Sequence, residues 1–232
     1  APFGMALGGG AEIPLAADKV IALAESYIGL VEVGAGLIPA GGGCKEMLLR
    51  SLERVPGSNS YLSGYEGSLD SVPAYKDPKS AVAWIFETIL GAKVSGSAQE
   101  ARQLGFLRYS DVIVPNPDKL LPDAKAELIE LTVHDYAPAK PASLPVLGVD
   151  VTDDLIAAAR NLLVVGSLTE HDLLIASKLA HVLAGGDAVR GNTVDEQHFL
   201  DLEREALLSL CGEEKSIARM AHVLKTGKRL RN

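Results

Sequence analysis

Hydrophobic positions in the last third of the chain recur at the spacing of amphipathic helices. A first helical face is formed by Leu155, Ile156, Ala159, Leu162 and Leu163. Thr169 precedes two acidic residues and predicts the start of a second helix, which ends at Gly185-Gly186. Two further helices are predicted, one around Phe199, Leu202 and Ala206 up to Cys211-Gly212, and one around Ile217, Met220 and Leu224.

The first part of the chain mixes short apolar runs with helical patterns. The runs at 19–24, 27–30 and 111–114 predict β-strands. Helices are predicted at 10–17, 43–52, 80–90, 98–104 and 117–134, and Gly105 is a suitable residue to end the fourth of these. The pattern therefore predicts an α/β protein with a helical C-terminal region.

Local composition predicts how the chain is organised. Residues 1–43 hold ten of the 23 glycines and only five charged residues, which favours a mostly buried segment with tight turns. Residues 51–79 are polar and rich in turn-forming residues, so we expect an insertion there. Three prolines between Pro138 and Pro145 indicate a linker, and no proline follows it. We expect a first domain at 1–137, a linker at 138–151 and a domain at 152–232 that is helical throughout.

The overall composition excludes several classes of protein. A net charge of −8 over 232 residues disfavours a dedicated nucleic-acid binder. Two cysteines, Cys44 and Cys211, are too few for a disulfide framework and fit a cytoplasmic protein. We expect no membrane span, because no apolar run reaches 18 residues, and no signal peptide, because the apolar start lacks a basic segment. The histidines show no zinc-binding spacing, so no metal site is expected.

The first candidate site is the glycine run Gly8-Gly9-Gly10. Glycines at the start of a helix leave backbone N–H groups open to a ligand, with the positive end of the helix dipole behind them. Such N–H groups stabilise an oxyanion or a phosphate. The simpler alternative is a flexible turn, and the glycines alone favour it.

The second candidate is a pair of acids, Glu12 and Glu32, in the most apolar stretch of the chain. Buried carboxyl groups are costly unless they are paired or used, and burial raises their pKa toward the range of acid–base catalysis. The alternative is that Glu12 is a first-turn helix acid and Glu32 is exposed. The pair by itself does not decide between these readings.

Three other features favour structural roles. The segment Val33–Gly41 begins like a dinucleotide fingerprint, but Pro39 replaces its third glycine, which disfavours a nicotinamide site. Cys44 fits a packed thiol better than a reactive one. Six bases and no acid follow from Lys215 onward, which favours a solvated tail over a polyphosphate contact.

Taken together, two segments resemble the crotonase (enoyl-CoA hydratase/isomerase) superfamily. They are Phe3–Glu12, with its glycine run, and Val31–Gly42, with Glu32 placed 20 residues after Glu12. A third segment, Val94–Leu107, is similar to the part of the family that follows the catalytic core. The sequence departs from the family at Gly43-Cys44-Lys45-Glu46, where a threonine-led stretch is usual.

The resemblance implies a fold and a reaction. The fold is a truncated crotonase-like ββα spiral followed by a helical C-terminal region. The reaction is hydration of a 2-enoyl-CoA to a 3-hydroxyacyl-CoA. Glu12 would activate the water, Glu32 would exchange the proton at the α-carbon, and the Gly9 N–H would be one oxyanion donor, with Gly8 and Gly10 also binding the substrate. Acyl-CoA is then the substrate, and no other cofactor is expected in this chain.

The ending, Ser209–Lys215 and Leu224–Asn232, resembles bacterial bifunctional fatty-acid β-oxidation proteins, in which a 3-hydroxyacyl-CoA dehydrogenase comes first and a hydratase-like domain last. This implies that the chain is the C-terminal piece of a longer polypeptide, whose NAD-binding dehydrogenase part would be its partner. A second oxyanion donor would precede Ala1, so we expect the piece alone to be weak or inactive.

Three alternatives stay open at this point. Two are activities on the same fold, a double-bond isomerase and a thioester hydrolase. The third is a non-catalytic helical scaffold that docks the dehydrogenase half. A homo-oligomer also remains open.

Overall fold

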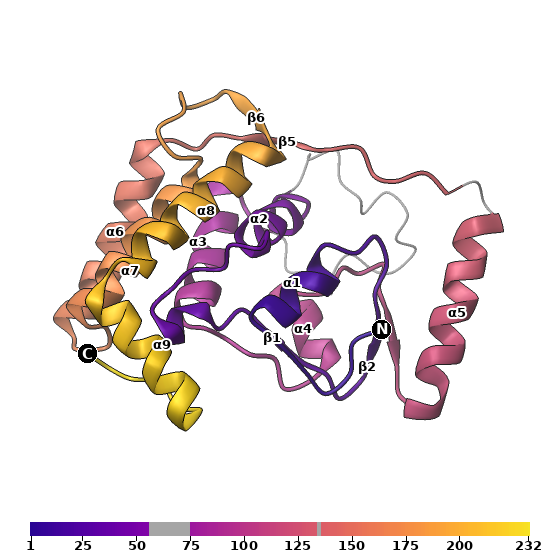
Figure 1. Ribbon diagram of the computed structural model, residues 1–232. Helices are drawn as coiled ribbons and strands as arrows, with labels where there is room; N and C mark the ends of the chain where they lie inside the picture. The colour runs from indigo at the N-terminus through magenta and orange to yellow at the C-terminus, as the bar shows by residue number, and fades with distance from the viewer. Residues whose placement is uncertain (56–74, 134–135) are drawn as a thin grey trace.

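The computed structural model describes residues 1–55, 75–133 and 136–232. The insertion expected at 51–79 lies mostly outside these residues. In the described part, short strands and longer helices alternate up to residue 133, and helices dominate afterwards (Figure 1). The predicted α/β class with a helical C-terminal region is therefore confirmed.

The strands form three two-stranded pairs. β1 (Met5–Leu7) and β3 (Tyr27–Gly29) run parallel, with Ala6 opposite Ile28. β2 (Ile21–Leu23) and β4 (Val112–Val114) are also parallel. β5 (Ser143–Pro145) and β6 (Thr193–Asp195) are antiparallel. The strands at β2, β3 and β4 match the apolar runs of the sequence, whereas β1 was not expected.

The helices lie close to their predicted positions. Those before the linker are α1 (Gly9–Leu15), α2 (Gly43–Leu52), α3 (Pro78–Leu90), α4 (Ala98–Leu104) and α5 (Pro117–Val133). Those after it are α6 (Val149–Val164), α7 (Glu170–Ala184), α8 (Glu196–Cys211) and α9 (Glu214–Thr226). A short 3-10 helix, η1 (Glu32–Ala35), carries one of the two candidate acids and was not expected.

Several of these helices begin at a residue whose side chain accepts a hydrogen bond from a backbone N–H group of the first turn. Asp77 and Ser80 form a capping box at α3, and Thr169 and Asp172 form another at α7. Asp195 accepts a hydrogen bond from the N–H of His198 at α8. The predicted helix start at Thr169 is confirmed, and so are the predicted ends at Gly105 and Gly185, both of which are left-handed.

The expectation of an entirely helical chain after the linker is wrong at one place. Thr193–Asp195 forms β6 and pairs with β5, which lies inside the segment 138–151. Strands of three residues are too short to show a period of two in the sequence. Proline in β5 is tolerated because a two-stranded pair has free edges.

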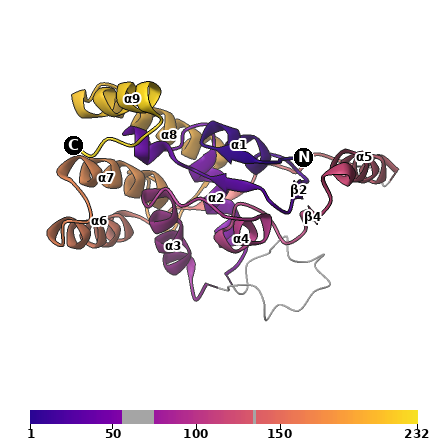
Figure 2. The ribbon, with the colours of Figure 1, turned by 90° about the horizontal axis from the view of Figure 1, so that it is seen from below.

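One hydrophobic core joins the two parts of the chain. It contains Leu15 of α1, Ile28 of β3 and Leu48 of α2, together with Leu179 of α7 and Phe199 of α8. A small second cluster of Ile21, Val114 and Leu120 attaches α5 to β2 and β4. Figures 1 and 2 show α6–α9 together at the C-terminal end and α5 at the opposite end, beyond the N-terminus.

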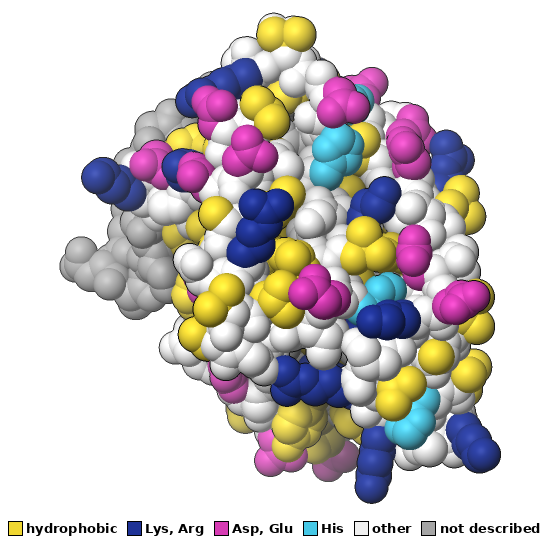
Figure 3. Space-filling view, turned by 90° about the vertical axis from the view of Figure 1, so that its left-hand side faces the viewer, with side chains coloured by type: hydrophobic (Ala, Val, Ile, Leu, Met, Phe, Trp, Pro, Cys, Tyr) yellow, Lys and Arg dark blue, Asp and Glu magenta, His cyan; other side chains and the backbone are white. Residues whose placement is uncertain are grey.

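The face at the C-terminal end carries charged side chains of both signs interspersed with apolar ones (Figure 3). Such mixing is typical of a solvated protein surface. No helix in the described part of the chain has the length and apolar character needed to cross a bilayer.

A buried hydrogen-bond chain ties the C-terminal helices to η1. The Ser216 hydroxyl of α9 donates to the carbonyl oxygen of Gly36 at 2.6 Å. The Ser216 hydroxyl oxygen itself lies 2.9 Å from Nε2 of His171 in α7, and Ser216 is fully buried. Because Gly36 ends η1, this chain fixes the short helix that begins with Glu32.

We predict that Ser216→Ala lowers the free energy of unfolding of the chain by about 1–3 kcal/mol, because it leaves two buried polar groups without their partner. Urea unfolding measures this change. Ser209→Ala, on the exposed surface of α8, is the control and should change stability by less than about 0.5 kcal/mol. Equal effects of the two substitutions would contradict the prediction.

Candidate active site

The glycine run forms the turn between β1 and α1. Gly8 has φ 57° and ψ −131°, a conformation that favours glycine, and its N–H donates to the carbonyl oxygen of Gly29 at 2.9 Å. Gly9 and Gly10 follow as the first residues of α1 and are exposed. N–H groups in the first turn of a helix have no acceptor within that helix. The arrangement is therefore the one expected from the sequence, a tight turn that presents backbone donors.

Glu12, on α1, is held by the backbone that leads into α2. Its Oε1 accepts hydrogen bonds from the N–H of Gly41 at 2.7 Å and from the N–H of Gly43 at 3.0 Å. A Cβ on Gly43 would lie 2.9 Å from this oxygen, so glycine permits the approach. The two donors at the N-terminus of α2 hold this oxygen in place. A Cβ on Gly9 would lie 3.8 Å from the other oxygen of Glu12, Oε2.

Glu32 lies against the glycine turn from the other side. A Cβ on Gly8 would be 3.2 Å from its Oε1, and Oε2 is buried without a hydrogen-bond partner among the described residues. Burial raises the pKa of Glu32 to about 7, and the charge of Glu12 also raises it, against two backbone hydrogen bonds that lower it. The structure thus brings both predicted acids to the glycine run, and they interact electrostatically. Their catalytic roles stay a prediction.

A third carboxyl group, Glu203 of α8, binds the N-terminus of α2 next to the donors of Glu12. It was not among the predicted site residues. It is fully buried and accepts hydrogen bonds from Gly42 N–H at 2.9 Å and from Lys45 N–H at 2.6 Å. Burial raises its pKa to about 7, the two N–H groups lower it, and the charge of Glu12 raises it. The sequence contains one indication that Glu203 is buried. Glu203 lies four residues after Phe199 and three before Ala206, on the apolar face of its helix.

Cys44 lies between these carboxyl groups and is a packed thiol, as predicted. It is fully buried, and its Sγ donates to the carbonyl oxygen of Pro39 at 3.3 Å. Burial raises its pKa well above the ordinary range, and the charges of Glu203, Glu32 and Glu12 raise it too. A thiol that stays protonated is a poor nucleophile.

The departure from the family pattern at residues 43–46 has a structural counterpart. Lys45 is buried, and its ammonium group pairs with Glu46 and, at 2.7 Å, with Glu196 of α8. Glu196 also accepts a hydrogen bond from Ala142 N–H at 2.6 Å. The departing residues therefore connect α2 to the helical region and to the segment 138–151.

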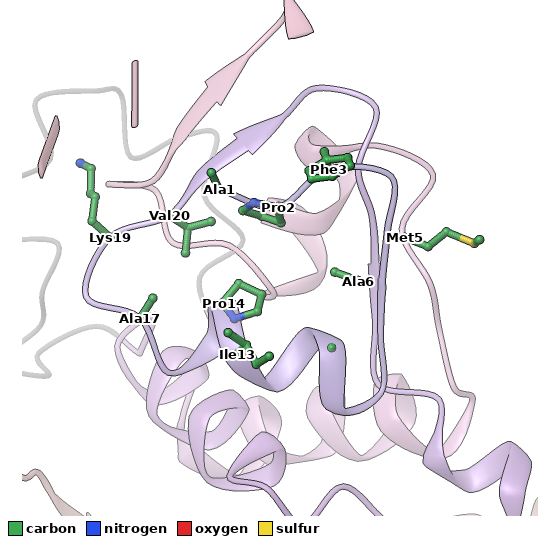
Figure 4. A pocket seen from close by; sticks show the side chains of 11 residues that line it. Ala1, Pro2, Phe3, Met5, Ala6, Ile13, Pro14, Ala17, Lys19 and Val20 are labelled. Atoms are coloured by element: carbon green, nitrogen blue, oxygen red, sulfur yellow. The ribbon is translucent and has the colours of Figure 1, made fainter. Parts of the chain in front are cut away.

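An apolar pocket of about 340 Å³ lies beside the site but on another face of α1 (Figure 4). Gly10, Ile13 and Pro14 of α1 line it, together with Ala17 beyond the end of the helix, and the residues around them come from the start of the chain. Phe3 and Ile13 are 70% and 76% exposed. Neither candidate acid lines this pocket.

No group of three or more potential metal-binding side chains is found in residues 1–55, 75–133 and 136–232. The three glutamates at the glycine turns bind backbone N–H groups instead, and of their oxygens only Glu32 Oε2 is buried without a partner among the described residues. The chemistry that this arrangement supports is proton transfer beside a set of backbone donors.

No family model matches the chain. Among curated proteins, it is 45% identical over all 232 residues to a probable 3-hydroxyacyl-CoA dehydrogenase of Bacillus subtilis, of which it spans 27%. A stretch of 48 residues is 52% identical to a putative fatty acid oxidation complex trifunctional enzyme of Rickettsia felis, covering 21% of this chain and 7% of that protein. The chain thus spans about a quarter of the length of the Bacillus relative.

Solved structures were also compared. The chain resembles an enoyl-CoA hydratase of Mycobacterium avium subsp. paratuberculosis with a TM-score of 0.49 and 16% identity, covering 99% of this chain and 62% of that one. It resembles a carnitinyl-CoA dehydratase of Mycobacterium avium with a TM-score of 0.48 and 20% identity, covering 98% and 59%.

The raised pKa of Glu32 predicts a pH-dependent effect on stability. Ionising this carboxyl group costs more in the folded chain than in the unfolded one, so the wild type loses stability as the pH rises from 4.5 to about 7. Glu32→Gln removes that cost. We expect the variant to gain roughly 2 kcal/mol relative to the wild type between about pH 4 and about pH 8.

Urea unfolding at several pH values measures this gain. Glu25→Gln is the control, because Glu25 is exposed in the same segment. A stability difference between Glu32→Gln and wild type that stays constant with pH would contradict the raised pKa.

Proposed function

We propose that this chain carries the hydration of a 2-enoyl-CoA thioester to a 3-hydroxyacyl-CoA, as part of a longer fatty-acid oxidation polypeptide. Glu12 and Glu32 are the acid–base pair, and the Gly9 N–H is an oxyanion donor. The resemblance of residues 3–42 to the crotonase superfamily and the name of the Bacillus relative support this proposal. That name also supports a dehydrogenase in the same polypeptide. NAD as the cofactor of that part follows from the sequence resemblance alone.

One observation carries the proposal: two carboxyl groups in different environments meet at one glycine turn. Glu12 accepts two backbone hydrogen bonds at the N-terminus of α2. Burial raises the pKa of Glu32 to about 7, so a large share of this carboxyl group carries a proton near neutral pH, and its Oε2 has no hydrogen-bond partner among the described residues. A pair whose environments differ in this way suits general base and general acid roles.

In the proposed reaction, Glu12 acts as the general base and Glu32 as the general acid. The Glu12 carboxylate takes a proton from a water molecule, whose oxygen forms a bond to the β-carbon of the enoyl group. The π electrons move toward the thioester, and the Glu32 carboxyl group delivers its proton to the α-carbon. Both acids lie at the same turn, so water and proton add to one face of the double bond. Afterwards Glu12 is protonated and Glu32 ionised, and proton exchange with solvent restores the starting state.

The glycine turn stabilises the charge that develops on the thioester oxygen. The Gly9 N–H belongs to the first turn of α1 and has no intrahelical acceptor. A donor aimed at an oxyanion typically contributes a factor of about 10²–10³ in turnover. Gly8 and Gly10 shape this turn, and a side chain on Gly8 would meet Glu32.

We predict that Glu32→Gln and Glu12→Gln each lower hydratase kcat by at least about 10²-fold, because each removes one proton-transfer group. The measurement follows the loss of ultraviolet absorbance of a conjugated enoyl-CoA in the whole polypeptide that contains this chain. The same assay on the 232-residue chain alone tests the expectation that it is weak or inactive.

Glu25→Gln is the control and should leave the rate unchanged. Near-normal turnover of Glu32→Gln would contradict the assignment. Turnover by isomerisation or thioester hydrolysis without hydration would favour the alternative activities.

A further inference from the structure

We propose that Glu203 is a positioning residue that sets the place of the Glu12 carboxylate through the N-terminus of α2. The inference rests on the proposed function and deepens it, since it assigns a role in the same site to the helical C-terminal region. Glu203 lies in α8, nearly 200 residues after Glu12 in the sequence. It touches neither the glycine run nor the proposed substrate, so its action has to pass through the backbone between them.

The N-terminus of α2 is bound by two carboxyl groups in alternation. Glu12 accepts from Gly41 and Gly43, and Glu203 accepts from Gly42 and Lys45. Each residue of the segment 41–43 therefore donates its N–H to one of the two acids. A shift of the backbone on the Glu203 side moves the donors that hold Glu12, because the bonded N–H groups belong to consecutive peptide units.

The glycines explain why the second acid is needed. Gly42 is the N-cap of α2, with φ 100°, where a residue with a side chain is strained. Gly41 and Gly43 allow the close approach of Glu12, which a Cβ would block. A glycine N-cap has no side chain with which to bind the first turn, and no side-chain cap of the kind seen at α3 and α7 is present here. Glu203 supplies that cap from another helix.

The burial of Glu203 argues for a role beyond packing. The side chain is fully buried on an apolar helix face, where an ionised carboxyl group costs free energy and a hydrophobic residue would be more favourable. Its two oxygens each accept one backbone hydrogen bond, from Gly42 and from Lys45. The free-energy cost of burying Glu203 is therefore borne at the helix end whose N–H groups hold Glu12.

Two readouts test the proposal, and the first does not depend on activity. Hydrogen exchange of single backbone amides, measured by NMR on the 232-residue chain, should accelerate about tenfold or more at Gly41 and Gly43 in Glu203→Gln, although these amides bind Glu12. Glu205→Gln, exposed on the same helix, is the matched control and should leave these rates unchanged. Acceleration confined to Gly42 and Lys45 would show a local cap only and would overturn the proposal.

The second readout is a double-mutant cycle on hydratase kcat in the whole polypeptide. Glu203→Gln should lower kcat about 10- to 100-fold with little change in KM, because it misplaces a catalytic group. If Glu203 acts through Glu12, its substitution should have little further effect in a Glu12→Gln background. Full additivity of the two losses, or an unchanged kcat, would overturn the proposal.

Glu203→Asp keeps the carboxyl group and replaces Glu203→Gln in the exchange experiment if Glu203→Gln does not fold. It is one methylene shorter and should accelerate exchange at Gly41 and Gly43 to a smaller extent; no change there would count against the proposal. A wild-type polypeptide without hydratase activity would refute the proposed function, while the exchange rates would still decide the role of Glu203.

Discussion

The N-terminus of α2 is the constraint on which the rest of the site depends. The backbone N–H groups of its first turn have no acceptor within the helix, and its N-cap is a glycine without a side chain to supply one. Two distant carboxyl groups, Glu12 and Glu203, accept hydrogen bonds from Gly42, Gly43 and Lys45 at this helix end and from Gly41 just before it. Satisfying the helix end therefore fixes one candidate catalytic acid and brings α1, α2 and α8 together. The same requirement places Cys44 among carboxyl groups, where it stays a protonated, packed thiol.

The helical region contributes to both sides of the candidate site. Glu203 supports the donors of Glu12, and Ser216 with His171 holds the end of η1, the short helix that carries Glu32. The shared hydrophobic core gives these contacts a rigid base, since it runs from α1 to α8. The buried polar groups of this region thus bind the backbone next to both acids. This supports the proposal that these helices have a supporting role in the site.

Much of the fold was predictable because helices of ten or more residues show their period in the sequence. α2 was predicted at its observed bounds, and the start of α7 at Thr169 follows from its cap. The strands β1, β5 and β6 were missed, since three residues show no period and no longer apolar run marks them, as it does for β2, β3 and β4. Glu12 and Glu32 stood out as acids in an apolar stretch. Glu203 did not, because its partners are backbone N–H groups of α2, and only the folded chain brings that helix end to α8.

The most direct test of the account is a crystal structure of the whole polypeptide with a saturated acyl-CoA analogue, which keeps the thioester carbonyl but has no double bond to hydrate. The account predicts that the carbonyl oxygen of the analogue lies within hydrogen-bond distance of the Gly9 N–H. The α- and β-carbons should lie between the carboxyl groups of Glu32 and Glu12, with Glu12 still bound to Gly41 and Gly43. An acyl group bound away from the glycine turn, with neither glutamate beside it, would contradict the account.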